Sequence, residues 1–179
     1  MKTARGGVSD VRDKLVLVTG GGAGIGRSIA LAFAKRGANV VITDLDVSHL
    51  ANVCREVEAL GVRCWMHVAD VSDELAMKRL ADDVAAGAGV PDVLVNDAGI
   101  GHLGPFLKSS LAHWQRILSV NVIGVVNGCY YFLPKMLAAG GVRRVVVIAS
   151  GASHYPPPNA AAYGGDPAGQ GADEGMLVA

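Results

Sequence analysis

Three polar residues in the second half of the chain have types and spacing suited to proton transfer. Asn121 stands in an apolar helical run, Ser150 follows a β-branched run, and Tyr163 comes 13 residues after Ser150. A carboxamide, a hydroxyl and a phenol held together can bind a substrate oxygen and move a proton to or from it. Each residue alone also fits a structural role, as a satisfied polar group in a helix, a cap at a strand end or a surface aromatic. Their order along one chain favours the catalytic interpretation.

A glycine-rich turn early in the chain is suited to binding an anion. The segment "TGGGAGIG" (19–26) joins a predicted strand to a predicted helix. Glycines let a backbone approach a pyrophosphate closely, and the first N–H groups of a helix point at it. A lone glycine-rich run often marks only a turn, but this context predicts a nucleotide site. The candidate contacts are Thr19, Gly20, Gly24, Ile25 and Gly26.

An acidic residue follows the second predicted strand at the distance expected for a ribose contact. Asp44 ends "VVITD", 20 residues beyond Gly24. A carboxylate there can accept hydrogen bonds from the adenosine ribose and would repel a 2′-phosphate. The alternative is a helix N-cap, a role that Asp46 or Ser48 fills equally well. Because the glycine turn carries no Arg or Lys, the sequence predicts NAD as cofactor and disfavours NADP.

Short β-branched runs alternate with longer helical patterns along most of the chain. Alternation of this kind predicts parallel strands joined by right-handed crossovers, hence an α/β fold with a doubly wound, Rossmann-type parallel sheet in the strand order 3-2-1-4-5. The predicted strands are 14–20, 39–43, 62–68, 92–96 and 143–150. The predicted helices are 24–36, 47–60, 73–86 (with Leu75, Leu80 and Val84 facing inward) and about 110–138.

Composition narrows the class of protein. At 179 residues, 51% apolar and 18% charged, the chain is long and apolar enough for one globular domain. Zero formal net charge gives no electrostatic reason for nucleic acid or an anionic membrane as partner. Runs such as "LVLV" and "VVVIA" are too short to span a bilayer. Three cysteines without C-x-x-C spacing predict buried thiols in a cytoplasmic protein, and neither a disulfide framework nor a metal site.

With these landmarks placed, the chain resembles the short-chain dehydrogenase/reductase family from about residue 14 to residue 164. "TGGGAGIG" matches its T-G-x-x-x-G-x-G turn, and "ADV" (69–71) matches the Asp-Val after the third strand. "NDAG" (96–99) matches N-N-A-G, with Asp97 replacing the second Asn. "VNVIG" (120–124) and "IASGAS" (148–153) match the segments that carry the catalytic Asn and Ser.

The resemblance implies hydride transfer between a nicotinamide and a secondary alcohol or ketone. Tyr163 would exchange the proton, Ser150 would bind the substrate oxygen, and Asn121 would support a proton-relay water. The implied cofactor contacts also include Asp70 and Val71 at the adenine and the loop residues Asn96, Ala98 and Gly99.

The family pattern breaks just after Tyr163. The family places a Lys four residues beyond its Tyr, to lower the pKa of the phenol and hold the nicotinamide ribose, and this chain has Pro167 there. We therefore expect a truncated or frame-shifted member that lacks its C-terminal strands and is impaired in catalysis.

Three units and two rival functions follow. We expect a polar extension (1–13), a Rossmann domain (14–164) and a disordered tail (165–179). The alternative to an impaired oxidoreductase is a catalytically silent dinucleotide-binding or interaction protein. A methyltransferase with a similar glycine turn would not need the Ser150–Tyr163 spacing. The family's dimer face often uses the long helix (about 110–138), but its partner helix would begin at Tyr163, so the sequence leaves a homo-oligomer open.

Overall fold

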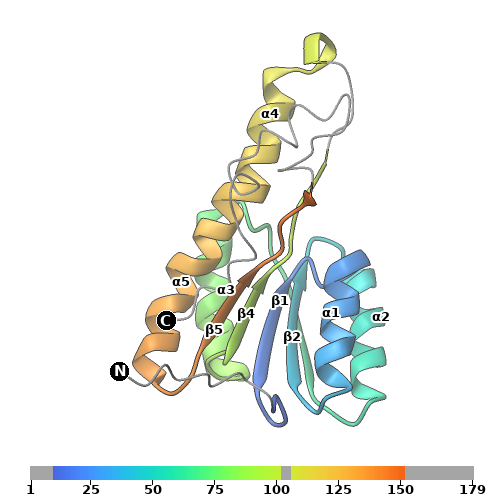
Figure 1. The fold of residues 1–179 in the computed structure, drawn as a ribbon, viewed down its shortest axis with the longest axis vertical. Helices are drawn as coiled ribbons and strands as arrows, with labels where there is room; N and C mark the ends of the chain where they lie inside the picture. Colours follow the sequence, from blue (N-terminus) through green and yellow to red (C-terminus); the bar gives the residue numbers. More distant parts are fainter. Residues whose placement is uncertain (1–9, 102–105, 152–179) are drawn as a thin grey trace.

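A computed structural model of the chain describes residues 10–101 and 106–151, in which strands and helices alternate (Figure 1). The strands are β1 (Leu15–Thr19), β2 (Asn39–Asp44), β3 (Cys64–Val68), β4 (Val93–Asn96) and β5 (Arg144–Val147). The helices are α1 (Gly24–Ala34), α2 (Val47–Glu58), α3 (Glu74–Gly87), α4 (Leu111–Leu118) and α5 (Gly124–Ala139), with the short helices η1 (Phe106–Lys108) and η2 (Ser119–Ile123). Tyr163, Pro167 and the expected tail (165–179) lie outside the described residues.

The strands form one parallel sheet in the order β3-β2-β1-β4-β5. This order confirms the predicted doubly wound architecture. The chain winds outward from β1 to β3, crosses the sheet, and continues outward through β4 to β5. The order therefore reverses between β1 and β4, and in folds of this kind a crevice opens there at the carboxyl ends of the strands.

Two apolar layers cover the sheet because successive side chains of a strand point to opposite faces. Val16 and Val18 of β1 pack with α1 and α2, while Leu15 and Leu17 pack with α3 and α5. Figure 1 shows the same division, with α1 and α2 on one side of the sheet and α3 and α5 on the other. Strand β1 is buried along its whole length, so both of its neighbouring loops are held firmly.

One long helical element runs from α4 through η2 to α5, close to the predicted range. It spans Leu111–Ala139, 29 residues, and an 18-residue window within it has a mean hydropathy of 1.4. It is the one helix in the described residues that could cross a membrane by length and composition. Core helices of soluble proteins meet the same test, and here Phe132 and Met136 are fully buried against the sheet. The fold thus accounts for the apolar face of α5 through packing.

Two expectations from the sequence are wrong. Cys54 and Cys64 form a disulfide and are not free thiols, because the turn between α2 and β3 folds the helix back on the strand and brings their Cα atoms to 5.4 Å. Leu75 faces solvent with 62% of its surface exposed. The buried stripe of α3 is Met77, Leu80, Ala81 and Val84, and Leu75 lies two residues, about half a helical turn, from that stripe.

Candidate active site

The glycine turn between β1 and α1 is tied to the neighbouring strand β2. Gly20 has a φ of +67°, a conformation that glycine adopts without strain. The Gly21 N–H donates to the Thr43 carbonyl at 3.1 Å, and the Gly22 N–H donates to Asp44 Oδ2 at 3.0 Å. The turn is therefore held open at the carboxyl edge of the sheet.

Helix α1 begins without a side-chain cap, unlike the other long helices that begin at loops. Asp46, Asp73 and Ser110 each accept backbone N–H bonds at the starts of α2, α3 and α4. The N-cap of α1 is Ala23, which has no side-chain acceptor. Apart from the Gly26 N–H, which faces Asp97, the first N–H groups of α1 have no side-chain cap beside the turn, and an anion is the partner that such groups favour.

Gly26 lets α1 pack directly on the turn. A Cβ at this position would overlap with the Gly20 carbonyl and lie 2.7 Å from Asp97 Oδ2. The N–H of Gly26 donates to the Asp97 carboxylate. The absence of a side chain at Gly26 therefore allows the first turn of α1 to lie close against the glycine turn.

Asp44 stands at the rim of the same opening. Its Oδ1 accepts from the Leu45 N–H at 2.7 Å, while its Oδ2 accepts the bond from Gly22. The alternative role for Asp44, as N-cap of the following helix, is filled instead by Asp46, which caps α2. The Asp44 carboxylate is thus oriented by two backbone donors, and each oxygen keeps acceptor capacity toward the opening.

Asp70 lies across the opening in a small polar cluster. Its Oδ1 accepts from the N–H and the hydroxyl of Ser72, at 2.9 and 2.6 Å, and its Oδ2 meets the Arg116 guanidinium at 3.1 Å. Burial raises the pKa of the Asp70 carboxyl, but the bonds from Ser72 and Arg116 outweigh it and leave the pKa below its usual value. This carboxylate is ionised at neutral pH.

Thr19 fixes the loop after β4. Its hydroxyl oxygen accepts from the N–H groups of Asp97 and Ala98, at 3.0 and 3.1 Å. Only 1% of Thr19 is exposed, so it supports the loop from below the surface. Asn96, also buried, contacts the Sγ of Cys129 through its amide at 3.8 Å.

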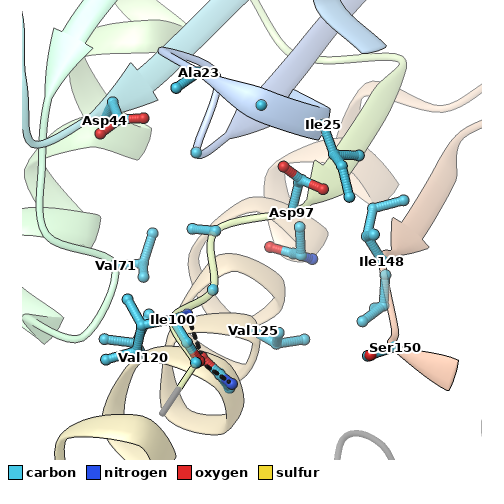
Figure 2. A pocket seen from close by; sticks show the side chains of 18 of the residues that line it. Ala23, Ile25, Asp44, Val71, Asp97, Ile100, Val120, Val125, Ile148 and Ser150 are labelled. Atoms are coloured by element: carbon cyan, nitrogen blue, oxygen red, sulfur yellow. Dashed lines mark hydrogen bonds between the residues drawn. The ribbon is translucent and has the colours of Figure 1, made fainter. Parts of the chain in front are cut away.

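Asn121 connects the loop after β4 to the long helix through two hydrogen bonds. It accepts from the Ile100 N–H at 2.9 Å and donates to the Ile100 carbonyl at 3.0 Å, as Figure 2 shows. Asn121 lies in η2, a π-helical turn, a local irregularity that is frequent at functional sites. Ser150 lies three residues beyond β5, on the opposite side of the opening (Figure 2).

The opening is a cleft of about 710 Å³ at the carboxyl edge of β1, β2, β4 and β5. Its volume is in the range of ligand sites. The predicted residues that line it are Gly20, Gly24, Ile25, Asp44, Asp70, Val71, Asn96, Ala98, Gly99, Asn121 and Ser150. Thr19 and Gly26 lie beneath its wall, and Tyr163 lies outside the described residues.

Comparison with known proteins agrees with this geometry. The family model of the short chain dehydrogenases matches residues 14–169. The chain belongs to this family.

Relatives of the chain carry oxidoreductase names. The chain is 48% identical over 120 residues to "Probable oxidoreductase EphD" of Mycobacterium tuberculosis (strain ATCC 25618 / H37Rv). The aligned region covers 67% of this chain and 20% of that protein. Two solved structures are each 32% identical. A xylitol dehydrogenase bound to NAD+ has a TM-score of 0.83 over 88% of this chain and 60% of that one. A 7α-hydroxysteroid dehydrogenase complexed with NADH and 7-oxo glycochenodeoxycholic acid has a TM-score of 0.81 over 87% and 60%. The chain thus spans only part of each relative's length.

Two charged residues of the cleft were not among the sequence candidates. Arg116, which pairs with Asp70, gave no signal, because its partner is 46 positions away along the chain. Asp97 was visible as a departure from the family's N-N-A-G, yet the sequence did not reveal what it contacts. Burial raises the pKa of the Asp97 carboxyl, and the bond from the Gly26 N–H partly offsets this.

Proposed function

We propose that the protein is an NAD-linked oxidoreductase that transfers a hydride between the nicotinamide and a small secondary alcohol or ketone. The observation that carries the proposal is the uncapped start of α1 beside the glycine turn, in one cleft with Asp44. An anion-binding helix start and a ribose-binding carboxylate are the two features that a dinucleotide site needs at its adenosine half.

Different groups of cleft residues would contact different parts of a bound dinucleotide. The turn and the first N–H groups of α1 would hold the pyrophosphate, Asp44 the adenosine ribose, and Asp70 with Val71 the adenine. The loop after β4 and the η2 turn lead toward Ser150, where the nicotinamide would lie. When bound, the nicotinamide supplies or accepts the hydride.

Preference for NAD over NADP follows from the charge at Asp44. A 2′-phosphate on the ribose would meet this carboxylate at close range, and like charges at short distance repel. Arg116 is the one cation among the described cleft residues, and it is paired with Asp70. No described basic side chain of the cleft therefore compensates for a phosphate beside Asp44.

The proposed chemistry at the far end of the cleft rests on the family pattern. Ser150 would bind the substrate oxygen and Tyr163 would exchange its proton, while Asn121 orders the loop through Ile100. Pro167 stands where the family has its Lys. That difference favours the second candidate, a chain that binds dinucleotide with little turnover. In either case we propose a small-molecule substrate.

Direct titration with NAD and NADP tests the proposal. We expect NAD to bind at least about tenfold more tightly, because the Asp44 carboxylate rejects the 2′-phosphate. Asp44→Ala should bring the two affinities close together. Asp83→Ala, which removes an exposed carboxylate of α3 outside the cleft, is the matched control and should leave the preference unchanged. Tighter binding of NADP by the unaltered chain would contradict the assignment.

A further inference from the structure

Asp97 occupies the inner side of the helix start proposed to bind pyrophosphate. It follows β4 directly, and its half-buried carboxylate points up at the first turn of α1, close to Ile25 (Figure 2). The Gly26 N–H donates to it, and a Cβ at Gly26 would come within 2.7 Å of its Oδ2. A fixed negative charge thus sits against the same α1 N-terminus that an anion would approach from the cleft side.

No described cation balances this charge. On α1, the Arg27 guanidinium turns away and pairs with Glu56 of α2. On β2, Asp44 is itself negative. Arg116 of α4 is engaged with Asp70, and from the β5 side the neighbour in Figure 2 is the apolar Ile148. The partial positive charge of the α1 N-terminus, about half an elementary charge, is therefore already opposed before any ligand binds.

We infer that the negative charge of Asp97 weakens the binding of the anionic pyrophosphate and so disfavours charged ligands relative to uncharged ones. Removal of this charge should tighten dinucleotide binding. This inference rests on the proposed dinucleotide site. An Asn has the same shape and can still accept the Gly26 N–H bond, so the substitution Asp97→Asn changes the charge and preserves the turn. The effect should follow the charge of the ligand, being large for NAD and absent for adenosine.

The pH dependence has a defined sign. Protonation of Asp97 removes the repulsion, so the affinity of the unaltered chain for NAD should rise, relative to Asp97→Asn, as the pH falls through the raised pKa of Asp97. Asp44 and Asp70 are unchanged between the two chains, and the Cys129 thiol, whose pKa burial raises, is neutral throughout this acidic range. The ratio of the two affinities therefore isolates Asp97.

The experiment measures NAD and adenosine affinities of the unaltered chain and of Asp97→Asn by calorimetric titration near pH 8 at low salt. We expect NAD to bind about tenfold more tightly to the variant, adenosine to bind equally to both, and the gain to shrink in high salt. Asp83→Asn, which removes an equal charge outside the cleft, should give no gain. Asp97→Ser, neutral and still able to accept the N–H bond, should act in the same direction if Asp97→Asn folds poorly.

The outcomes separate this inference from the proposed function. NAD binding of equal strength by the unaltered chain and both Asp97 variants overturns the inference and leaves the proposed function standing. An equal gain for NAD and adenosine also overturns it, because the cause would then be structural. Absence of NAD binding by the unaltered chain and by every variant rejects both.

Discussion

At the scale of single residues, Gly26 is the position where the turn tolerates least change. A Cβ here would overlap with the Gly20 carbonyl, a backbone group that cannot move without shifting the end of β1, and would also crowd the Asp97 carboxylate. We expect Gly26→Ala to lower the free energy of unfolding by about 1–3 kcal/mol through overpacking, and to abolish NAD binding.

Gly87→Ala is the matched control for this substitution. Gly87 ends α3 in open space, so an added methyl group meets nothing and alanine favours the helix. We expect an unchanged or slightly higher unfolding free energy, by up to about 1 kcal/mol, with normal NAD binding. Denaturant unfolding and NAD titration measure both effects. Gly26→Ala with full stability and affinity would mean that the turn is not closely packed.

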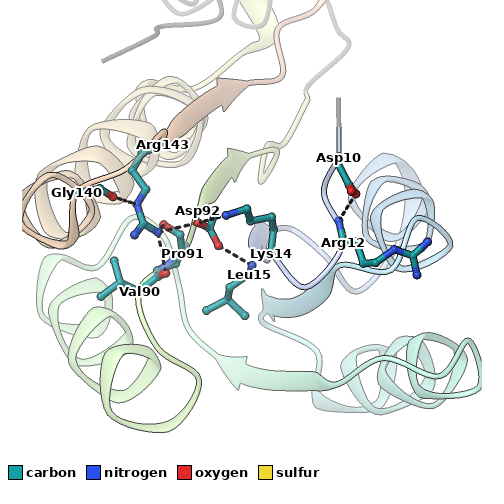
Figure 3. A network of polar contacts seen from close by, with 9 residues as sticks. All are labelled: Asp10, Arg12, Lys14, Leu15, Val90, Pro91, Asp92, Gly140 and Arg143. Atoms are coloured by element: carbon teal, nitrogen blue, oxygen red, sulfur yellow. Dashed lines mark hydrogen bonds and ion pairs between the residues drawn. The ribbon is translucent and has the colours of Figure 1, made fainter. Parts of the chain in front are cut away.

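At the scale of elements, a polar network joins the amino-terminal ends of three strands. Asp92, just before β4, accepts from the Leu15 N–H of β1 at 2.9 Å and from the Arg143 guanidinium at 3.0 Å, with Lys14 nearby at 3.5 Å (Figure 3). Arg143 precedes β5 and also bonds the carbonyls of Val90, Pro91 and Gly140. Asp92 thus holds β1, β4 and β5 in register at the edge opposite the cleft.

Asp92→Ala should therefore destabilise the sheet. It leaves the Leu15 N–H without its acceptor and the largely buried Arg143 guanidinium without its carboxylate, which costs about 1–3 kcal/mol of unfolding free energy. Asp82→Ala, which breaks exposed pairs with Lys78 and Lys135, should cost clearly less, because water screens both pairs. Denaturant melts of both variants give the comparison, and equal losses would show that the network adds nothing beyond surface pairing.

At the scale of the whole molecule, the proposed turnover depends on a cation near Tyr163, the residue that we propose exchanges the proton. No Lys follows Lys135 and no Arg follows Arg144, so the sequence near Tyr163 supplies no cation. A phenol with a pKa near 10 is a weak base at neutral pH, and loss of a ribose anchor disturbs positioning as well.

We expect the 179-residue chain alone to oxidise secondary alcohols with NAD at least about a hundredfold more slowly than a version extended with a family-like Tyr-x-x-x-Lys helix and the following strands. NAD-linked oxidation of a panel of secondary alcohols by both proteins measures this. NAD affinity, which we propose residues 19–99 carry, serves as the internal control for folding. Comparable turnover would mean that another group activates Tyr163.

The local patterns were enough to predict the scaffold and much of the cleft wall. The continuous apolar run of β1 and the helical spacing in α2 depend on neighbours in the sequence, so the strand order, the glycine turn and the position of Asp44 could be inferred from the sequence. The caps Asp46 and Ser110 are local for the same reason, since each bonds an N–H within three residues. In α3, where Leu75 suggested a different face, the same kind of pattern failed because packing against α5 chose the helix rotation.

Only the tertiary structure decided which side chains meet across the chain. The disulfide between Cys54 and Cys64, the pairing of Arg116 with Asp70, and the grip of Asn121 on Ile100 each join separate elements. The position of Asp97 beneath α1 was likewise decided by the tertiary structure. The motif shows that Asp97 departs from the family pattern, but it does not show which backbone group the side chain will face. Such contacts are set by how the helices pack on the sheet, and that packing is a property of all the layers together, which no short stretch of sequence contains.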